Sequence, residues 1–94
     1  MDCNELKFSR HALVQMFARS ISKEEAIKVI NNGEVIANYP DDQPYPSKLF
    51  LGYVNKRPIH VVAGYDADEK TCILITVYQP DLDIWESDHK TRRK

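Results

Sequence analysis

The sequence predicts a single α+β domain in which two N-terminal helices pack on an antiparallel sheet of three or four strands, followed by a short C-terminal tail. Two amphipathic segments, each preceded by a serine, occupy the first third of the chain. Runs rich in β-branched and aromatic residues fill most of the remainder, separated by short turn-forming segments. A length of 94 residues suits one domain spanning 1–94, with a body at about 6–86 and a charged tail at 87–94.

The first helix is predicted to begin after Ser9, a good N-cap, and to run to about Arg19. Four apolar residues at i, i+3, i+4 spacing form its predicted core side, namely Ala12, Leu13, Met16 and Phe17. Beside them runs a polar strip at i, i+4 and i+8, made of His11, Gln15 and Arg19. We interpret the strip as a functional edge of the helix.

The second helix has the clearest local signal. Ser22 and Glu25 form a capping box, in which each side chain accepts a hydrogen bond from the backbone of the other residue. The helix is expected to bury Ala26, Ile27, Val29 and Ile30. Gly33 is predicted to end it in the left-handed conformation, which glycine adopts without strain.

The remaining runs predict strands at Val35–Tyr39, Leu49–Val54, Ile59–Tyr65 and Cys72–Tyr78, with an irregular proline-rich loop at 40–47. If Tyr65 pairs with Thr71, then Ala63 faces Ile73, Val61 faces Ile75 and Ile59 faces Val77. Such pairing predicts one continuous apolar face under the helices. The other face would carry His60 opposite Thr76, with Tyr78 one step along.

Composition restricts the classes of function. The formal net charge is −1, whereas proteins that hold nucleic acids through the phosphate backbone usually have a basic excess. No apolar run approaches the roughly 20 residues of a membrane span, and the acidic N-terminus does not resemble a signal peptide. We therefore expect a cytoplasmic protein without membrane contact, in which Cys3 and Cys72 are reduced.

Several segments, taken together, resemble a known family. They are Ser9-Arg10-His11-Ala12, Met16, Arg19, Ile21-Ser22, Glu25, Gly33-Glu34-Val35-Ile36, Tyr39-Pro40, Pro58-Ile59-His60-Val61-Val62, Ile75-Thr76-Val77-Tyr78, Pro80 and Trp85. With these residues the chain resembles the bacterial family DUF4258, and more distantly the RelE, ParE and BrnT toxins. Gln15 stands where a basic residue is expected in this family. The resemblance implies a RelE-like arrangement of two helices and an antiparallel sheet.

The resemblance also implies a metal-independent endoribonuclease or RNA-binding module of toxin–antitoxin type. Four motif residues are the expected catalytic groups: His11, His60, Arg19 and Tyr78. One histidine would serve as base and the other as acid, while Arg19 would steady the phosphate. The expected RNA contacts are Thr76, Lys56, Arg57, Arg92 and Arg93. The partners would be RNA and a small antitoxin-like protein.

Each of these residues also has a purely structural interpretation. His60 would then hydrogen-bond Thr76, Arg19 would pair with a carboxylate, and Tyr78 and Trp85 would be core aromatics. The basic tail would be solvated and frayed. No cofactor or metal is expected, because the sequence has neither a glycine-rich phosphate loop nor zinc-ligand spacing. A non-catalytic protein-interaction module and a homodimer remain as alternative functions.

Overall fold

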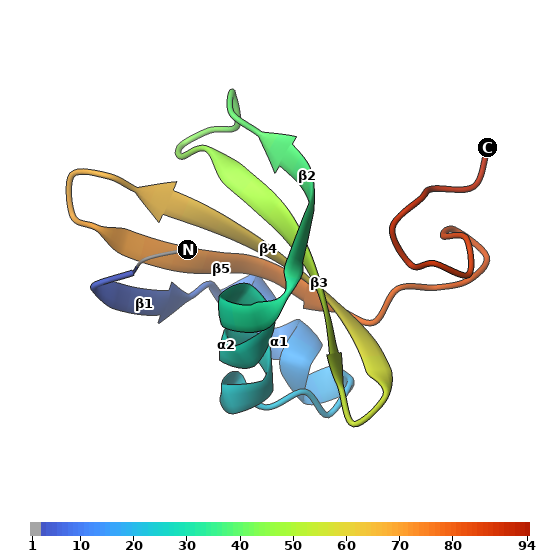
Figure 1. The fold of residues 1–94 in the computed structure, drawn as a ribbon. Helices are drawn as coiled ribbons and strands as arrows, with labels where there is room; N and C mark the ends of the chain where they lie inside the picture. Colours follow the sequence, from blue (N-terminus) through green and yellow to red (C-terminus); the bar gives the residue numbers. More distant parts are fainter. Residues whose placement is uncertain (1–2) are drawn as a thin grey trace.

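Figure 1 shows the computed structural model of the chain, which describes residues 3–94. The elements follow in the order β1 (Glu5–Phe8), α1 (Arg10–Ala18), α2 (Lys23–Asn32), β2 (Glu34–Tyr39), β3 (Ser47–Val54), β4 (Arg57–Asp66) and β5 (Thr71–Tyr78). Within the described range, five strands form one sheet with the order β1-β5-β4-β3-β2. Neighbouring strands are antiparallel except β1 and β5, which are parallel.

The first strand overturns the predicted fold class. β1 precedes both helices and adds a parallel fifth strand to the sheet, so the predicted RelE-like arrangement of two leading helices on three or four antiparallel strands is wrong. The strand is only four residues long, which gives a weak alternating pattern. Its pairing partners, from Thr71 to Leu74, lie at the far end of the chain, where no local signal points to them.

The helix starts agree with the predictions. Ser9 caps α1 through a 3.0 Å hydrogen bond from the Ala12 N–H to Ser9 Oγ. The capping box of α2 is complete, with Glu25 N–H donating to Ser22 Oγ at 3.1 Å and Ser22 N–H donating to Glu25 Oε1 at 2.8 Å. Local side-chain chemistry thus determines where both helices begin.

Gly33 ends α2, but for a different reason from the predicted one. Its φ of −78° is not left-handed, so the predicted cap conformation is wrong. A Cβ at this position would collide with the Val29 carbonyl oxygen and lie 2.6 Å from the Leu51 carbonyl oxygen. Glycine is needed here because the end of α2 approaches β3 at backbone distance.

The main core lies between the helices and one face of the sheet, which we call the helix face. Both helices lie on the same side of the sheet (Figure 1), with α1 packed on β5 and α2 packed on β3 and β4. The sheet contributes Phe50, Val54, Ile59, Val61, Ala63, Leu74 and Val77 to this cluster. Burial of this continuous apolar surface is the main stabilising contribution to the fold.

The register of β4 and β5 differs from the predicted one. Tyr65 pairs with Cys72, and a β-bulge between Val62 and Ala63 shifts the later pairs, so that His60 lies opposite Tyr78. The bulge moves Ile73 and Ile75 off the helix face, where they were predicted, and they line a groove on the other face. A bulge inserts one unpaired residue, which reverses the facing of every residue beyond it.

The C-terminal residues form an ordered segment, which we call the strap (residues 81–93). Its backbone hydrogen bonds include Trp85 N–H to Asp81 O at 2.8 Å, Glu86 N–H to Thr91 O at 2.8 Å and Arg93 N–H to Ile84 O at 2.8 Å. Arg93 Nε also donates to Leu82 O at 2.6 Å. This network differs from the solvated, frayed tail considered for 87–94.

Two further observations concern the cysteines and the membrane. Cys3 and Cys72 form a disulfide with a Cα–Cα distance of 5.5 Å, which joins the start of the described chain to β5. The predicted reduced pair is therefore wrong. Neither helix in the described part of the chain has the length and apolar character needed to cross a bilayer.

Candidate functional site

The sheet separates the predicted catalytic residues into two groups. Ile59 and Val61 point to the helix face, so His60 between them points to the opposite face, which we call the strap face. Tyr78 pairs with His60 and Thr76 pairs with Val62, which places Tyr78 and Thr76 on the strap face as well. His11 and Arg19 belong to α1 and its C-cap, on the helix side.

His60 is fully buried beneath the strap. Its Nδ1 lies 3.0 Å from Tyr78 Oη, and its Nε2 lies 2.6 Å from the backbone carbonyl oxygen of His89. The Trp85 ring packs edge-on against the imidazole with 4.6 Å between centroids. We call His60, Tyr78, Trp85, His89 and Tyr53 the His60 cluster.

The hydrogen bonds determine the protonation of His60. A carbonyl oxygen only accepts, so Nε2 carries the proton and Nδ1 of the neutral ring accepts from the Tyr78 hydroxyl. Burial lowers the pKa of His60, and the hydrogen bond to the His89 carbonyl opposes this effect. Burial also raises the pKa of the Tyr78 phenol. The pair is therefore neutral near pH 7, and both imidazole nitrogens are occupied.

The cluster contains two residues that the sequence analysis did not select. Tyr53 Oη lies 3.1 Å from His89 Nδ1, and the two rings meet edge to face at 5.9 Å. Leu49, Leu51 and Tyr53 are every second residue of β3, so they share one face of the sheet. The strand pattern was therefore sufficient to predict the side of the sheet to which Tyr53 points. His89 lies in a charged segment without periodicity, and no sequence signal placed it over the sheet.

Gln15, the middle residue of the polar strip of α1, forms a hydrogen bond with the backbone of β5. β1 pairs with β5 only as far as Leu74, which leaves the following backbone groups of β5 without a strand partner. Gln15 Oε1 accepts from the Val77 N–H at 3.0 Å, and Ser9 Oγ donates to the Ile75 carbonyl at 2.9 Å. Gln15 thus satisfies a backbone N–H group of β5 that has no strand partner. This hydrogen bond accounts for an amide side chain where the family resemblance predicts a basic residue.

His11 and Arg19 do not join the His60 cluster by any hydrogen bond among residues 3–94. Both side chains are exposed on the helix side. The Arg19 carbonyl accepts from Arg57 Nη1 at 3.0 Å, which ties the end of α1 to the start of β4. The two predicted catalytic histidines are therefore on different sides of the sheet.

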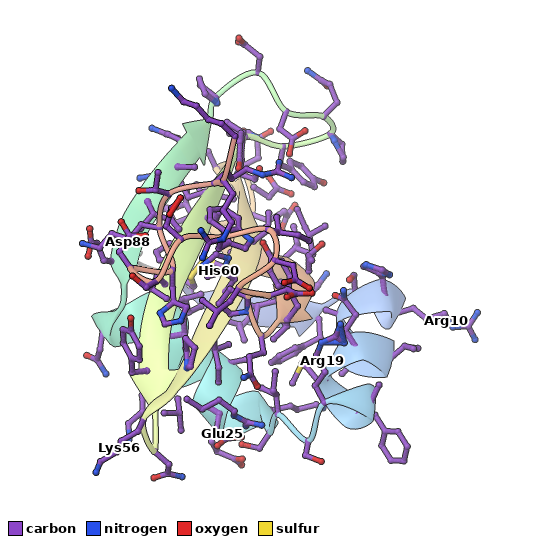
Figure 2. All side chains as sticks on the ribbon, turned by 90° about the vertical axis from the view of Figure 1, so that its right-hand side faces the viewer. Arg10, Arg19, Glu25, Lys56, His60 and Asp88 are labelled. Carbon is purple, nitrogen blue, oxygen red and sulfur yellow. A yellow bond between two sulfur atoms is a disulfide. The ribbon has the colours of Figure 1, made fainter. Side chains whose placement is uncertain are left out.

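The predicted RNA contacts are partly engaged within the chain. Arg57 also donates to the Ser20 carbonyl at 3.1 Å and pairs with Glu25 at 3.4 Å, and Arg93 pairs with Glu86 at 3.2 Å. Arg92 lies over the Trp85 ring at 5.7 Å. Thr76 is half-buried on the strap face. Lys56 is exposed at the tip of the β3–β4 turn (Figure 2).

The outer side of α1 exposes three apolar side chains, two of which were predicted to be core. Leu13 is 40% exposed, Val14 is 63% exposed and Phe17 is 90% exposed. Only Ala12 and Met16 of this helix are buried, on the side of α1 that packs on β5. The prediction that Leu13 and Phe17 belong to the core is wrong.

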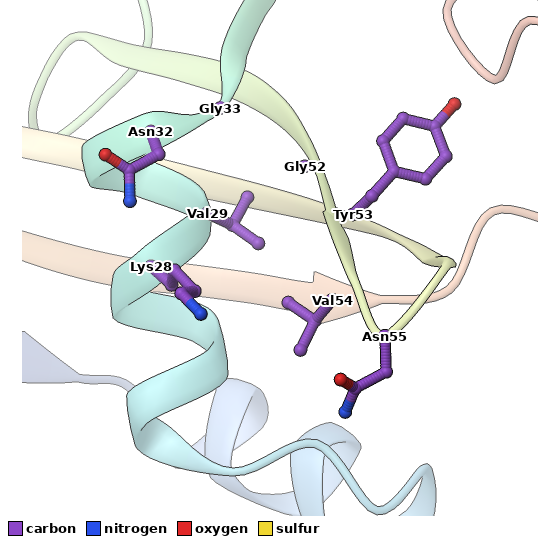
Figure 3. Close-up of a pocket in the computed structure, with 8 residues that line it drawn as sticks. All are labelled: Lys28, Val29, Asn32, Gly33, Gly52, Tyr53, Val54 and Asn55. Carbon is purple, nitrogen blue, oxygen red and sulfur yellow. The ribbon is translucent and has the colours of Figure 1, made fainter.

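Hollows lie on both sides of the sheet. A cavity of about 210 Å³ lies between α2 and β3, where Val29 and Val54 point into the space and Tyr53 points to the opposite side (Figure 3). A larger groove of about 720 Å³ lies on the strap face beside β1, and its lining includes Ile73 and Ile75. Among residues 3–94, no cluster of three or more His, Cys, Asp or Glu side chains is arranged to hold a metal ion.

The fold and site define a small α+β domain with a mixed sheet and a sealed histidine. Residues 8–79 match the family described as domain of unknown function DUF4258, and the chain belongs to this family. No curated protein and no solved structure gives a significant match. The matched range ends before the strap, so Trp85 and His89, which cover His60, lie outside it.

Proposed function

We propose that this chain is a non-catalytic binding module of the DUF4258 family, which acts by docking a partner protein. The observation that supports this proposal best is the state of His60. It is 0% exposed, and each of its two ring nitrogens already has a partner within the chain. A group in this state stabilises the fold and has no nitrogen available to a substrate.

General acid–base catalysis needs a titratable group within hydrogen-bond reach of the substrate. His60 has no such access beneath Trp85, and His11 lies on the other side of the sheet. A toxin-like endoribonuclease using these two histidines would require the strap to leave the sheet. It would also use Arg57 and Arg93, which are held by carboxylates of the same chain. The nuclease is therefore the rival proposal that an experiment must exclude.

The test is RNA cleavage by the purified full-length chain. A labelled single-stranded oligoribonucleotide is incubated with the parent protein and with the His60→Gln, His11→Ala and Tyr78→Phe variants. We expect no cleavage above the protein-free control, and no difference among the variants. Inducible expression in a bacterial host should leave growth and total RNA unchanged.

One outcome would overturn the proposal. Cleavage by the parent protein that disappears in both the His60→Gln and His11→Ala variants would establish a nuclease, provided that both variants keep the parent thermal unfolding transition. Tyr78→Phe tests the phenol separately, because it removes the hydroxyl that reaches His60 and keeps the ring that packs on the imidazole.

The cytoplasmic location also remains a proposal. Disulfides are rare in the cytosol, so the bonded pair of Cys3 and Cys72 counts against it. Alkylation of free thiols at the moment of cell lysis tests the location. Two alkylated cysteines per chain would support a reducing compartment, and none would exclude it.

A further inference from the structure

The strap covers one end of its face of the sheet, and the other end, beside β1, carries a groove that we call the β1 groove (Figure 1). Its lining comes from β1, β5, the end of β4 and the loop at 42–45. Its volume of about 720 Å³ falls within the range of about 300–1,000 Å³ that is usual for ligand sites. Ile73 and Ile75 of β5 are half-buried and line this hollow, so it offers apolar contacts to a ligand.

The charged groups of the β1 groove are mostly acidic. Four carboxylate residues and one cation, Lys7, belong to its lining. The carboxylates are those of Glu5, Asp42, Asp66 and Glu69. None of the four forms an ion pair within the described range 3–94. The groove therefore has a net negative charge, which favours a cationic ligand.

Tyr45 responds to this negative charge. Its pKa is raised above the usual tyrosine value, chiefly by the charge of Asp66 and a hydrogen bond to that carboxylate, with smaller contributions from desolvation and from Glu69. Asp66 also accepts hydrogen bonds from the Asp68 N–H at 3.1 Å and the Glu69 N–H at 3.3 Å. These donors are neutral, so they leave the charge of Asp66 uncompensated.

An arginine side chain combines the chemical features that match the groove. Its aliphatic stem suits Ile73 and Ile75, and its charged end suits the carboxylates. The planar guanidinium binds a carboxylate through two parallel hydrogen bonds and stacks on aromatic rings such as that of Tyr45, which favours arginine over lysine. A nucleic acid is disfavoured, because its phosphates would meet the same carboxylates.

A second copy of the chain is a poor occupant of the groove. Two β1 grooves placed face to face would bring their carboxylates together. The basic residues of the C-terminus are already engaged, since Lys90 pairs with Glu34 and Arg93 pairs with Glu86. A copy that offered its C-terminus to the groove would have to break these pairs.

We propose that the β1 groove docks a basic, arginine-containing segment of a partner protein. The stem of an arginine packs on Ile73 and Ile75. Its guanidinium lies among the carboxylates of Glu5, Asp66 and Glu69. This proposal rests on the proposed binding function and specifies the chemistry of the partner.

The test uses three synthetic peptides of equal length, whose binding to the full-length chain is measured by fluorescence anisotropy. The first alternates arginine with leucine, the second glutamate with leucine, and the third arginine with serine. We expect the arginine–leucine peptide to bind at least about tenfold more tightly than each of the others, because glutamate is repelled and serine offers no apolar contact. Raising the salt concentration should reduce the difference from the glutamate peptide.

Variants assign the binding to the groove. Glu5 and Glu69 are exposed, and their side chains form no hydrogen bond among residues 3–94, so the double variant Glu5→Lys, Glu69→Lys should fold and weaken the arginine–leucine peptide by about tenfold or more. The matched control Glu24→Lys, Asp83→Lys makes the same change in net charge on α2 and the strap, and should change the affinity by less than about threefold. Lys7→Glu should tighten binding by about threefold or more, a gain that misfolding cannot produce.

Each contrary result has a defined meaning. Equal binding of the arginine–leucine and glutamate–leucine peptides overturns the proposal, and so does an equal loss of affinity in the groove variant and its matched control. A concentration-dependent dimer that Glu5→Lys, Glu69→Lys abolishes would identify a second copy as the occupant and overturn it too. Tighter binding of a single-stranded oligoribonucleotide than of the arginine–leucine peptide would also overturn it. RNA cleavage lost in His60→Gln would instead overturn the proposed function, and the peptide results would still decide the chemistry of the groove.

Discussion

The two faces of the sheet are covered in different ways. The helix face is covered by α1 and α2 and is built from fully apolar side chains such as Leu74 and Val77. The strap face is covered by an irregular segment, and its centre is a hydrogen-bonded imidazole beneath Trp85. The helices are held on the sheet by a large buried apolar area, whereas the strap is held by a few directional contacts. The helix face should therefore dominate stability, while the strap face should carry the pH dependence.

The first prediction concerns a core residue of the helix face. Leu74→Ala should lower the free energy of unfolding by about 2–5 kcal/mol, because it opens a cavity in a fully buried site. Urea denaturation measures the effect. A loss below about 1 kcal/mol would show that the helix face is not the principal core.

The second prediction concerns the strap. Trp85→Ala should lower the free energy of unfolding by less than Leu74→Ala does, because the strap can detach while the sheet stays folded. Amide hydrogen exchange should show lost protection in residues 81–93 and retained protection in β4 and β5. Equal loss of protection throughout would mean that the strap and the sheet unfold as one unit.

The third prediction is a pH dependence that belongs to the strap face. Burial holds the folded-state pKa of His60 below the ordinary histidine value of 6.5, so the unfolded chain takes up the proton first as the pH falls. Stability should be constant above the unfolded-state pKa and decrease as the pH falls through it toward the folded-state value. Unfolding free energies at pH 8 and pH 5 measure this. His60→Gln should reduce the difference, whereas Leu74→Ala should preserve it.

The fourth prediction concerns α2, which covers part of the helix face. Ser22→Ala should cost about 1 kcal/mol, because it removes one half of the capping box of α2. Thermal unfolding detects this change. Ser87→Ala, at an exposed serine of the strap that caps neither α1 nor α2, is the comparison and should change the transition by less than half as much.

The smallest effect is expected at α1. Phe17→Ser should change the unfolding free energy by no more than about 0.5 kcal/mol, because the side chain is almost fully exposed. A loss as large as that of Leu74→Ala would show that Phe17 belongs to the helix-face core.

Local signals in the sequence predicted the parts of the fold that local contacts determine. Ser9, Ser22 and Glu25 form the capping bonds that their spacing indicated. The three hairpin-forming strands also follow from alternation and turn chemistry. β1 was missed because its four residues depend on a parallel partner at the other end of the chain. The bulge opposite Val62 and Ala63, which leaves Ile75 of β5 unpaired in the register, was missed because no residue type there demands it.

The candidate site was harder to predict for a related reason. The sequence indicated that His60 and Tyr78 share a face, and the structure places them in direct contact. It did not indicate that the His89 carbonyl covers the imidazole, because a backbone acceptor carries no residue signature. The exposure of Phe17 was missed as well, since helical spacing identifies an apolar side without stating whether a partner in the same chain buries it.

The parallel pairing of β1 with β5 has a consequence for biosynthesis. Translation proceeds from the N-terminus at about 5–20 residues per second, so β1 leaves the ribosome several seconds before its partner exists. During that interval Leu6 and Phe8 have no sheet to pack on, although both helices and the central hairpin are already available. The nascent chain therefore exposes the apolar side chains of β1 until β5 has been synthesised.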